Sequence, residues 1–323
     1  MQNIAVIGAG MSGITCAEYL CSRGFKVSVF EKSRGLGGRL ATRRINNDLS
    51  VDHGVQYISA KSSAFKKYLK ECISLGYAEY WEPSGMDAQY LNQNKIVVGT
   101  PGMNSILKFK SKNLDIKFSY KVKKVIKKNS KQWAIDFENV KFQNSFDLVV
   151  FAIPPDQVKE LIAEEKSIVE EMSFVELDPC WTLILNTKKK LGCYDFNRFQ
   201  GGKIASIVNN TSKPNRNKLY NSYVIHASSE WTKENLFLER TAIELNIVKL
   251  LEDKLNENIE IEYLKAHRWL YAQTKVPLGK AFSKNKDNTL FICGDWCLGA
   301  NVESAFSSGL TLAEFVESNF RHK

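Results

Sequence analysis

A glycine-rich turn close to the start of the sequence constrains this chain more than any other feature. Residues 4–7 are apolar and predict a buried strand, and Gly8-Ala9-Gly10-Met11-Ser12-Gly13 predicts a tight turn into a helix that begins near Ser12. The first glycine suits the turn, the second lets the backbone approach a pyrophosphate, and the third allows close packing of helix and strand. A second strand over 25–30 ends in Glu31, an acid placed to bind ribose hydroxyls. This order predicts a dinucleotide-binding unit with phosphate at the helix N-terminus.

A second glycine run indicates which dinucleotide such a unit would bind. After Glu31 come Gly35, then Gly37-Gly38-Arg39 and Thr42. An acid followed by a glycine pair and an arginine resembles the motif of FAD enzymes in the amine oxidase superfamily. The glycine pair would let the loop turn back under the pyrophosphate, and Arg39 could pair with its charge. The alternative for Arg39 is a solvated loop residue.

The C-terminal part of the sequence carries a second motif of the same kind. Residues 290–293 predict a strand that ends at Gly294-Asp295, and Asn301 precedes a helix that continues through Val316. Asp295 can accept a hydrogen bond from a ribitol hydroxyl, and amides at the start of the helix, near Val302, would point toward the flavin. Two motifs at opposite ends of the sequence favour FAD over NAD as the bound cofactor.

Two stretches between these motifs extend the cofactor unit. Residues 51–57 surround Gly54 with polar groups, and such a glycine suits a backbone that lies against the flat flavin ring. Residues 146–153 form a continuous apolar run that predicts a strand buried on both faces, so the chain returns to the parallel sheet there. Pro154 and Pro155 stop that strand where a ligand would lie.

The remaining stretches predict a second domain. Strands over 116–126, 133–137 and 140–142 should form an antiparallel meander that stays with the cofactor unit, whereas residues 156–287 combine strands with a long helix over 239–255. We therefore predict an α/β protein in which a Rossmann-type FAD-binding domain carries an inserted α+β substrate domain. The predicted FAD-binding domain comprises residues 1–60, 97–155 and 288–323, and the predicted substrate domain comprises residues 61–96 and 156–287.

Composition argues against several other classes of protein. The sequence of 323 residues has no apolar run of about 18 residues, and the glycine motif leaves no room for a targeting peptide. We expect a soluble, cytoplasmic protein without a membrane partner. The net charge of +10 gathers lysines over 108–131 and 188–190, but these alternate with apolar residues as on exposed strand faces. We expect no nucleic-acid partner.

Cysteine and histidine spacing predicts no metal site. Seven cysteines lie scattered without a C-x-x-C pair, and none of the four histidines shares a helical face with a ligating partner. Scattered cysteines, odd in number, indicate a reducing compartment.

Several longer motifs carry a resemblance that extends from Ile4 to Val316. They are Glu31-Lys32-Ser33-Arg34-Gly35, Gly37-Gly38-Arg39, Gly54 with Gln56-Tyr57, Gly99 with Pro101-Gly102-Met103, Ala266-His267-Arg268-Trp269-Leu270-Tyr271-Ala272 and Cys293-Gly294-Asp295-Trp296-Cys297-Leu298. On these motifs the chain resembles the short bacterial members of the renalase family, within the flavin amine oxidase superfamily. Lys61 departs from the family's pattern, which has arginine there.

The resemblance implies an oxidase of 2-dihydro isomers of NAD(P)H, with the 6-dihydro isomers as further candidates. Such an enzyme returns the dinucleotide to NAD(P)+ and passes electrons to molecular oxygen as hydrogen peroxide. Hydride loss from a dihydronicotinamide yields an aromatic cation directly, so no catalytic acid, base or nucleophile is needed. The sequence has no such constellation, and we predict no catalytic side chain. The protein would hold the substrate ring parallel to the flavin and exclude water.

The resemblance also implies which residues contact cofactor and substrate. The predicted cofactor-binding residues are Gly8, Gly10, Met11, Ser12, Gly13, Glu31, Lys32, Gly38, Arg39, Gly54, Gln56, Tyr57, Val122, Ala152, Asp295, Val302 and Ala305. The predicted substrate-binding residues are Tyr57, Ile58, Ser59, Ala60, Lys61, Val98, Gly99, Thr100, Trp181, His226 and Val302. Core packing is the alternative for Trp181, and a structural role is the alternative for His226.

Two other functions stay open. A flavin amine oxidase would share both cofactor motifs and bind a neutral amine in an aromatic cage, for which the candidates are Tyr57, Trp181, Trp269 and Trp296. A flavin-bearing interaction protein without turnover is the third reading, because a fold does not fix a function. Intact cofactor motifs at both ends of the sequence argue against that third reading.

Overall fold

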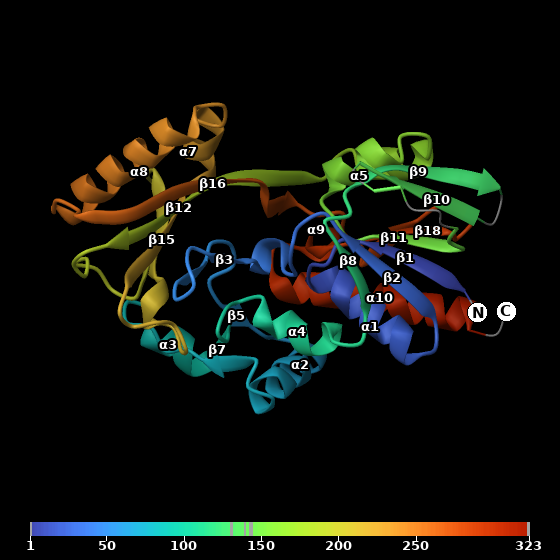
Figure 1. Cartoon of the computed structure of the whole chain (residues 1–323), viewed down its shortest axis with the longest axis horizontal. Helices are drawn as coiled ribbons and strands as arrows, with labels where there is room; N and C mark the ends of the chain where they lie inside the picture. The colour runs from blue at the N-terminus through green and yellow to red at the C-terminus, as the bar shows by residue number, and fades with distance from the viewer. Residues whose placement is uncertain (1, 130–131, 139, 142–144, 322–323) are drawn as a thin grey trace. The chain divides into compact units, whose positions relative to one another are not determined.

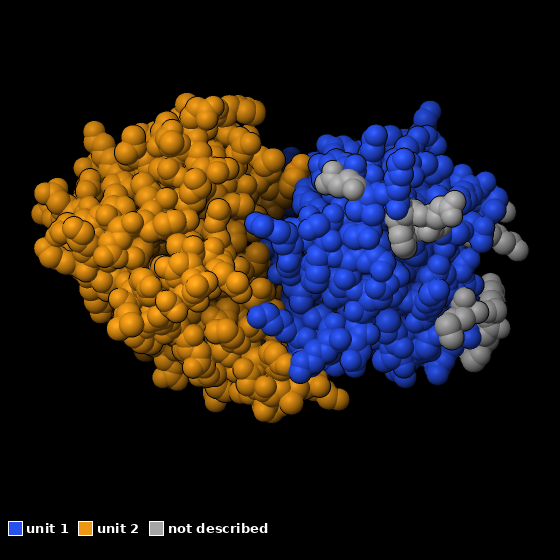
Figure 2. Space-filling model, viewed as in Figure 1, with its two compact units in different colours: residues 1–38, 107–177, 274–323 blue, residues 39–106, 178–273 orange. Residues whose placement is uncertain are grey.

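The computed structural model describes all residues except 1, 130–131, 139, 142–144 and 322–323. The chain forms two compact units, which Figure 2 shows in blue and orange. Unit 1 comprises Met1–Gly38, Leu107–Leu177 and Thr274–Lys323, and unit 2 comprises Arg39–Ile106 and Asp178–Gln273. These bounds differ from those of the predicted domains, whose division by binding role stays a prediction.

A six-stranded sheet forms the centre of unit 1. Its strands are β1 (Asn3–Ile7), β2 (Lys26–Glu31), β8 (Asp115–Phe118), β11 (Leu148–Phe151), β17 (Phe282–Lys284) and β18 (Leu290–Cys293), in the order β17-β18-β11-β1-β2-β8 (Figure 1). Neighbouring strands pair parallel except β17, which runs antiparallel to β18. Residues 4–7 of β1 and all of β11 and β18 are buried, as expected for strands covered on both faces. This confirms the predicted α/β fold class.

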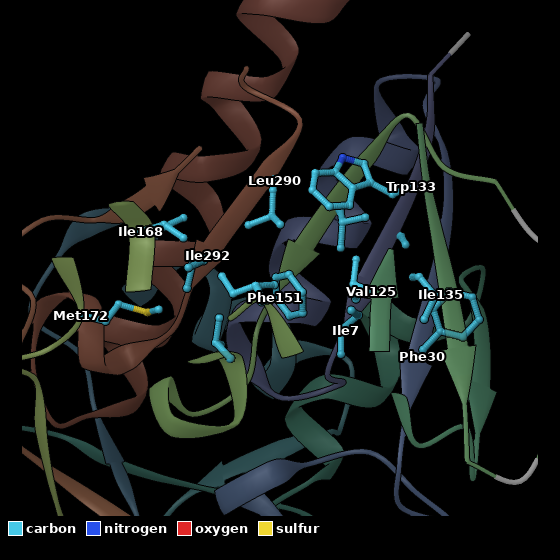
Figure 3. Packing of buried hydrophobic residues seen from close by; sticks show 14 of the residues in the cluster. Ile7, Phe30, Val125, Trp133, Ile135, Phe151, Ile168, Met172, Leu290 and Ile292 are labelled. Atoms are coloured by element: carbon cyan, nitrogen blue, oxygen red, sulfur yellow. The ribbon is translucent and has the colours of Figure 1, made fainter. Parts of the chain in front are cut away.

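Helices and a strand pair pack around this sheet. The helix α1 (Met11–Ser22) connects β1 to β2, and α10 (Val302–Phe320) packs against α1. The glycine at 309 lets the α10 backbone lie against that of Ser12. β9 (Val122–Asn129) and β10 (Gln132–Phe137) pair antiparallel, and Trp133 joins Phe30 and Phe151 in one core (Figure 3). The unit also contains α5 (Pro155–Leu161), α6 (Lys166–Glu171) and the short α9 (Asp295–Leu298).

The predicted meander over 116–142 differs from the structure. The stretch 116–126 is broken at Ser119, whose φ is 61°, and its first part is β8, which pairs parallel with β2. Ser119 and Tyr120 donate backbone N–H groups to the carbonyl oxygens of Ser33 and Glu31 and so extend that pairing. The prediction of one strand was wrong, because a left-handed residue turns the chain out of the parallel sheet before β9 begins. Phe142, in the third predicted strand, lies outside the described residues.

A five-stranded sheet forms the core of unit 2. Its strands are β12 (Glu176–Thr187), β13 (Phe196–Arg198), β14 (Ile204–Asn209), β15 (Asn221–Ala227) and β16 (Ile261–Val276), in the order β13-β14-β15-β12-β16. The pairs β13–β14, β14–β15 and β15–β12 are antiparallel. The helices α7 (Ser229–Glu234) and α8 (Arg240–Leu255) bury Trp231, Ile243 and Ile247 in the same core. The antiparallel sheet with its helices confirms the expected architecture of the substrate domain, although the 16-residue strand β16 was not predicted.

Shorter elements of unit 2 carry many of the predicted site residues. β3 (Thr42–Arg44) pairs with β4 (Ser50–Asp52), and β7 (Ile96–Gly99) lies between β5 (Ile58–Ser59) and β6 (Ala78–Tyr80) in an antiparallel sheet. The neighbouring helices are α2 (Ser63–Ser74), α3 (Ala88–Gln93) and α4 (Ser105–Ser111). In the described part of the chain, no helix is both long enough and apolar enough to cross a membrane.

Candidate functional site

The predicted cofactor residues of unit 1 gather at one edge of its sheet. Because β1, β2, β11 and β18 run parallel, their carboxyl ends share that edge. Gly8, Glu31, Ala152 and Asp295 end or closely follow these strands. The sheet order places β2 on one side of β1 and β11 on the other, which is the switch point at which open α/β sheets bind ligands.

The three positions of the first turn are occupied by glycine for different physical reasons. Gly8 has a φ of 108°, and a Cβ there would lie 2.5 Å from the Ala152 carbonyl oxygen. A Cβ at Gly13 would overlap the Gly8 carbonyl oxygen, so packing requires both glycines. At Gly10, φ is −85° and a Cβ would have no atom of the described residues within 4 Å. Neither strain nor packing explains Gly10, and its close approach to a pyrophosphate stays a prediction.

The second glycine run lies directly against the first. The Gly37 N–H donates to the Ala9 carbonyl oxygen at 3.1 Å, and a Cβ at Gly38 would lie 3.7 Å from the Cα of Gly10. The first turn of α1, which contains residues 11–12, begins beside these loops and holds no acidic side chain. Amides at the start of the helix and in the glycine loops can therefore bind an anionic pyrophosphate.

Glu31 links the two loops and keeps capacity for a ligand. Its Oε2 accepts the Ala9 N–H at 2.9 Å and its Oε1 accepts the Ser33 N–H at 2.7 Å, and the residue is 8% exposed. A carboxylate offers about four lone-pair positions, so each oxygen can still accept a ribose hydroxyl. The neighbouring Lys32 is exposed, and its Nζ lies 3.3 Å from Oε1 of Gln157.

The C-terminal motif forms the start of two helices. Asp295 begins α9, is 6% exposed and has the Thr274 hydroxyl 3.4 Å from its Oδ2. Asn301 caps α10 by accepting the Ser304 N–H at 2.8 Å. The other predicted contacts in this unit are Ala152 after β11, Val122 at the start of β9, and Val302 and Ala305 in the first turn of α10. Their contacts with FAD stay predictions.

Gly54 in unit 2 has a structural explanation that the sequence did not suggest. A Cβ there would overlap the Arg39 carbonyl oxygen and lie 3.3 Å from the Trp269 ring. The Val55 N–H donates to the same carbonyl at 2.8 Å. The chain's own packing thus requires this glycine, and its contact with flavin stays a prediction. Arg39 donates from its guanidinium to the Ala272 carbonyl oxygen at 3.4 Å.

A buried ion cluster, which sequence reasoning missed, supports the loop that contains Gln56. Asp52, Lys213 and Arg216 form this Asp52 cluster, and their side chains are at most 3% exposed. Oδ2 of Asp52 accepts from Lys213 Nζ at 3.2 Å and from Arg216 Nη2 at 2.6 Å. Lys213 also donates to Gln56 Oε1 at 2.9 Å. No local sequence pattern indicates this cluster, because Lys213 and Arg216 lie more than 150 positions after Asp52.

Burial and charge oppose each other within the Asp52 cluster. Burial acts to raise the pKa of Asp52, but Lys213 and Arg216 outweigh it and hold that pKa well below its usual value. Burial lowers the pKa of Lys213 to about 8, although Asp52 acts in the other direction. The cluster therefore carries one net positive charge at neutral pH.

Several predicted substrate residues surround the pairing of β5 with β7. Tyr57 precedes β5, is half-buried and meets Phe196 edge-on at 5.5 Å. Burial, followed by the neighbouring Tyr90, raises the pKa of Tyr57. Ile58 and Ser59 pair with β7, and they are followed by Ala60, which is half-buried, and Lys61, which is exposed.

The predicted substrate residues on and after β7 are buried. Val98 is 0% exposed, and the Gly99 carbonyl oxygen accepts from Arg216 at 2.9 Å. Thr100 donates its N–H to the Tyr77 carbonyl oxygen at 3.0 Å and its hydroxyl to the Gly76 carbonyl oxygen at 3.1 Å. These contacts fix the segment, and a substrate role for its side chains stays a prediction.

The structure does not bring Trp181 and His226 together. Trp181 lies in the core beneath α7 and α8, and its indole N–H donates to the Asn235 carbonyl oxygen at 3.1 Å. His226 pairs with Thr182, which follows Trp181 along β12. Because successive side chains of a strand point to opposite faces, His226 lies on the face of the sheet opposite to Trp181. Its Nδ1 is 3.1 Å from the Ser206 hydroxyl, and it forms a hydrogen bond with the backbone of His53. His226 thus contacts the loop that contains His53, and Trp181 contacts the helical side of the sheet, while a substrate contact of either residue stays a prediction.

His226 belongs to a group of neutral histidines around His53. The His53 ring meets those of His267 and Trp269 at 4.8 and 5.0 Å, and Trp269 donates its indole N–H to the His53 carbonyl oxygen at 3.0 Å. Burial lowers the pKa of His53 to about 3 and those of His226 and His267 to about 4. Residues 266–269 belong to a motif noted in the sequence, but no sequence pattern predicts their contact with His53. Among the described residues, no group of three or more His, Cys, Asp or Glu side chains could hold a metal ion.

Two cavities lie apart from these residues. One, of about 600 Å³, is lined by Ser167, Ile168, Glu171 and residues 280–286 of unit 1. The other, of about 330 Å³, is lined by Lys203, Trp231, Asn246, Lys249, Leu250 and Asp253 of unit 2. No predicted site residue lines either cavity.

Comparisons with known proteins agree with this geometry. Residues 6–72 match the NAD(P)-binding Rossmann-like domain family, and residues 73–316 match the family described as flavin containing amine oxidoreductase. A putative protoporphyrinogen oxidase from Exiguobacterium sp. 255-15 superposes with a TM-score of 0.71 at 11% identity, over 98% of this chain and 99% of that one. Putrescine oxidase bound to putrescine gives 0.69 at 14% identity, with 98% and 99% covered. These likenesses show the fold alone.

Sequence matches to curated relatives are short. An L-amino-acid oxidase of Sistrurus catenatus edwardsii is 33% identical over 70 residues, which are 22% of this chain and 13% of that protein. The chain thus spans far less than two thirds of the length of this relative. The amine oxidoreductase model, in contrast, matches more than half of the chain. The chain therefore belongs to the flavin containing amine oxidoreductase family.

Proposed function

We propose that the protein is an FAD-dependent oxidase of 2-dihydro isomers of NAD(P)H, with the 6-dihydro isomers as further substrates, and that it forms NAD(P)+ and hydrogen peroxide. The family implies FAD. Gly10 supports this cofactor, because a nearby pyrophosphate explains a glycine that packing does not. The resemblance to renalases supplies the substrate class. When bound, FAD would accept the hydride and pass the electrons to oxygen.

The residues of unit 1 would hold the dinucleotide part of FAD. The glycine loops and the first amides of α1 would bind the pyrophosphate. Glu31 would bind the ribose hydroxyls through the free lone pairs of its carboxylate, and Asp295 would accept from the ribitol chain.

The charge around the predicted substrate residues is the observation that favours a dinucleotide over an amine. The Asp52 cluster contributes one net positive charge. Arg43 and Arg198 lie close enough to act electrostatically on His53 and Tyr57. Positive charges in a partly desolvated region repel an ammonium ion and attract an anion. A dinucleotide, whose phosphates are negatively charged, therefore suits this positively charged environment better than an amine does.

The chemistry asks little of the side chains. Hydride loss from a dihydronicotinamide gives an aromatic cation, and protein residues need only orient the ring and exclude water. Oxidation of an amine first requires loss of a proton from the ammonium form. The buried His226, whose pKa burial lowers to about 4, would be a poor base for that step at neutral pH.

Anaerobic mixing of the FAD-loaded protein tests the proposal. A 2-dihydronicotinamide dinucleotide should bleach the flavin absorbance at least about 100-fold faster than ordinary 4-dihydro NADH, because a site that aligns C2 or C6 holds C4 out of reacting position. Small amines such as putrescine should leave the absorbance unchanged. After air is admitted, hydrogen peroxide should form in proportion to the substrate oxidised.

The alternative function is an FAD-dependent amine oxidase, which the family name and the edge-on contact of Tyr57 with Phe196 favour. Rapid bleaching by a simple amine, together with inert dihydronicotinamides, would establish that alternative and reject the proposal. Protein that stays colourless and takes up no FAD would reject both.

A further inference from the structure

We infer that Asp52, Lys213 and Arg216 are positioning residues, whose buried side chains fix the two backbone segments that carry predicted flavin- and substrate-binding residues. These segments are 52–57, with Gly54, Gln56 and Tyr57, and 99–103, with Gly99 and Thr100. The inference rests on the proposed function for what the segments do. The contacts that fix them all lie within unit 2.

The carboxylate of Asp52 has four donors around it. Its Oδ1 accepts the Thr42 hydroxyl at 2.7 Å and the Met103 N–H at 2.9 Å. Its Oδ2 accepts from Lys213 and Arg216. Four donors use the lone-pair positions of a carboxylate fully, so the orientation of this side chain is determined. Through Met103 N–H, the carboxylate ties the end of segment 99–103 directly to segment 52–57.

Arg216 makes a second connection between the same segments. Its Nη2 donates both to Asp52 Oδ2 at 2.6 Å and to the Gly99 carbonyl oxygen at 2.9 Å. The guanidinium therefore holds the start of segment 99–103, while Asp52 holds its end. The turn leaves no room for a side chain at Gly99, because a Cβ there would lie 2.5 Å from the Gly102 carbonyl oxygen.

Lys213 and Gln56 fix segment 52–57 from within. Gln56 Nε2 donates to the carbonyl oxygens of Asp52 at 2.7 Å and Gly54 at 3.0 Å, while its Oε1 accepts from Lys213. Asn210 Oδ1 accepts the Asp52 N–H at 3.2 Å. The loop that precedes Tyr57 is thus held by hydrogen bonds to its backbone N–H and carbonyl groups and to the Gln56 side chain.

This arrangement serves geometry more than stability. Removing three charged side chains from water costs free energy that their mutual attraction often does not recover, and apolar replacements of equal volume are frequently as stable. Directional hydrogen bonds, in contrast, fix loops that apolar packing would leave adjustable. The benefit of the Asp52 cluster therefore lies in preorganising the two segments.

The test compares Arg216→Lys with Arg268→Lys in the FAD-loaded protein. Both arginines donate to a backbone carbonyl oxygen, Arg216 to Gly99 at 2.9 Å and Arg268 to Leu236 at 2.8 Å, and both variants keep the charge. In Arg216→Lys, amide hydrogen exchange over 99–103 should accelerate at least tenfold, with unchanged exchange in α10. The value of kcat/KM for a 2-dihydronicotinamide dinucleotide should fall roughly 10- to 100-fold with an unchanged flavin spectrum. Arg268→Lys should change neither.

Lys213→Met separates the two segments and guards against misfolding of the first variant. This variant keeps the ion pair of Asp52 with Arg216, which has no net charge. Amide hydrogen exchange should therefore accelerate over 52–57 but not over 99–103. Uniformly faster exchange, or none, in both variants would overturn the inference, as would loosened segments with wild-type kcat/KM. If the wild type oxidises an amine instead, that amine serves as the substrate for the kinetic comparison. The proposed function would then have failed, while the exchange data would still decide the role of the Asp52 cluster.

Discussion

The glycine loops of unit 1 and the polar loop 52–57 of unit 2 are both predicted to contact FAD, the first at the pyrophosphate and the second at the flavin ring, but different forces shape them. A Cβ at Gly10 would meet no atom of the described chain within 4 Å, whereas a Cβ at Gly54 would overlap the Arg39 carbonyl oxygen. The first loop is open on the side where a ligand is expected, and the second is fixed by its own protein. At the carboxyl edge of the sheet, where a ligand is expected, a half-buried glycine that packing leaves unexplained therefore supports a ligand contact, whereas Gly54 is already explained by packing.

The largest effect should follow from Gly10→Val. The side chain would enter the expected path of the pyrophosphate, so FAD affinity should fall at least about 1,000-fold, or roughly 4 kcal/mol, while the apoprotein stays folded. FAD titration of the apoprotein, with circular dichroism for the fold, measures both. Gly35→Val is the matched control, because Gly35 also has open space for a Cβ but lies exposed in the loop. A Gly10→Val protein that purifies yellow would remove the best support for the site.

Gly54→Ala should show the opposite pattern. The new methyl group would collide with the Arg39 backbone, so the apoprotein should lose roughly 3 kcal/mol of unfolding free energy whether or not FAD is present. Urea unfolding of the apoproteins measures this. Gly10→Ala, studied in parallel, should unfold within about 1 kcal/mol of the wild type and lose FAD affinity instead. Equal stability of the two alanine variants would mean that the two loops do not differ as described.

Glu31→Gln should have a smaller effect on the glycine-loop side. The amide keeps the shape of the carboxylate but has one acceptor oxygen, so it can no longer bind both the Ala9 and Ser33 N–H groups and a ribose. FAD should bind about tenfold more weakly, or about 1.4 kcal/mol. The control is Asp147→Asn, which changes a carboxylate that accepts the Asn3 N–H at 2.8 Å before the start of β11, far from the carboxyl edge. An equal loss in both variants would indicate general destabilisation rather than loss of a ligand.

The same contrast explains what the sequence could predict. The unit 1 edge depends on short-range spacing: each strand end lies within a few residues of the group that it places, as with Gly8 after β1 and Glu31 at the end of β2. Parallel pairing then brings these ends together without further information. The fold class and the cofactor loops could therefore be predicted from local motifs.

Long-range partners could not be predicted in this way. The Asp52 cluster joins residues more than 150 positions apart, and no periodicity links Asp52 to Lys213 or Arg216. Strand alternation could have separated Trp181 from His226 only with the register of β12 against β15, which places His226 opposite Thr182. The break at Ser119 depends on one left-handed residue in a lysine-rich stretch.

The last prediction is a pH dependence of stability that the histidines in and around the polar loop should produce. His53 lies directly after Asp52 and is 6% exposed, and burial lowers its pKa to about 3 from an ordinary value of 6.5. Between those values the unfolded chain binds a proton at His53 that the folded protein does not bind. The free energy of unfolding should therefore fall as the pH falls through this window, by up to about 1.4 kcal/mol per pH unit for each such histidine. His226 and His267, with pKa values lowered to about 4, contribute with the same sign.

Replacing His53 by Phe should remove one histidine's share of this slope and keep the ring contacts with His267 and Trp269. Urea unfolding between pH 7 and 5, above the range in which Asp52 takes up a proton, should give a slope that is smaller by about 1 kcal/mol per pH unit. Tyr223→Phe is the control. It removes a hydroxyl whose pKa is raised to about 12 and which therefore does not titrate in this range, so its effect on stability should be the same at pH 7 and pH 5. An unchanged slope in His53→Phe would mean that His53 titrates normally in the folded protein and that the loop is more open to water than its contacts indicate.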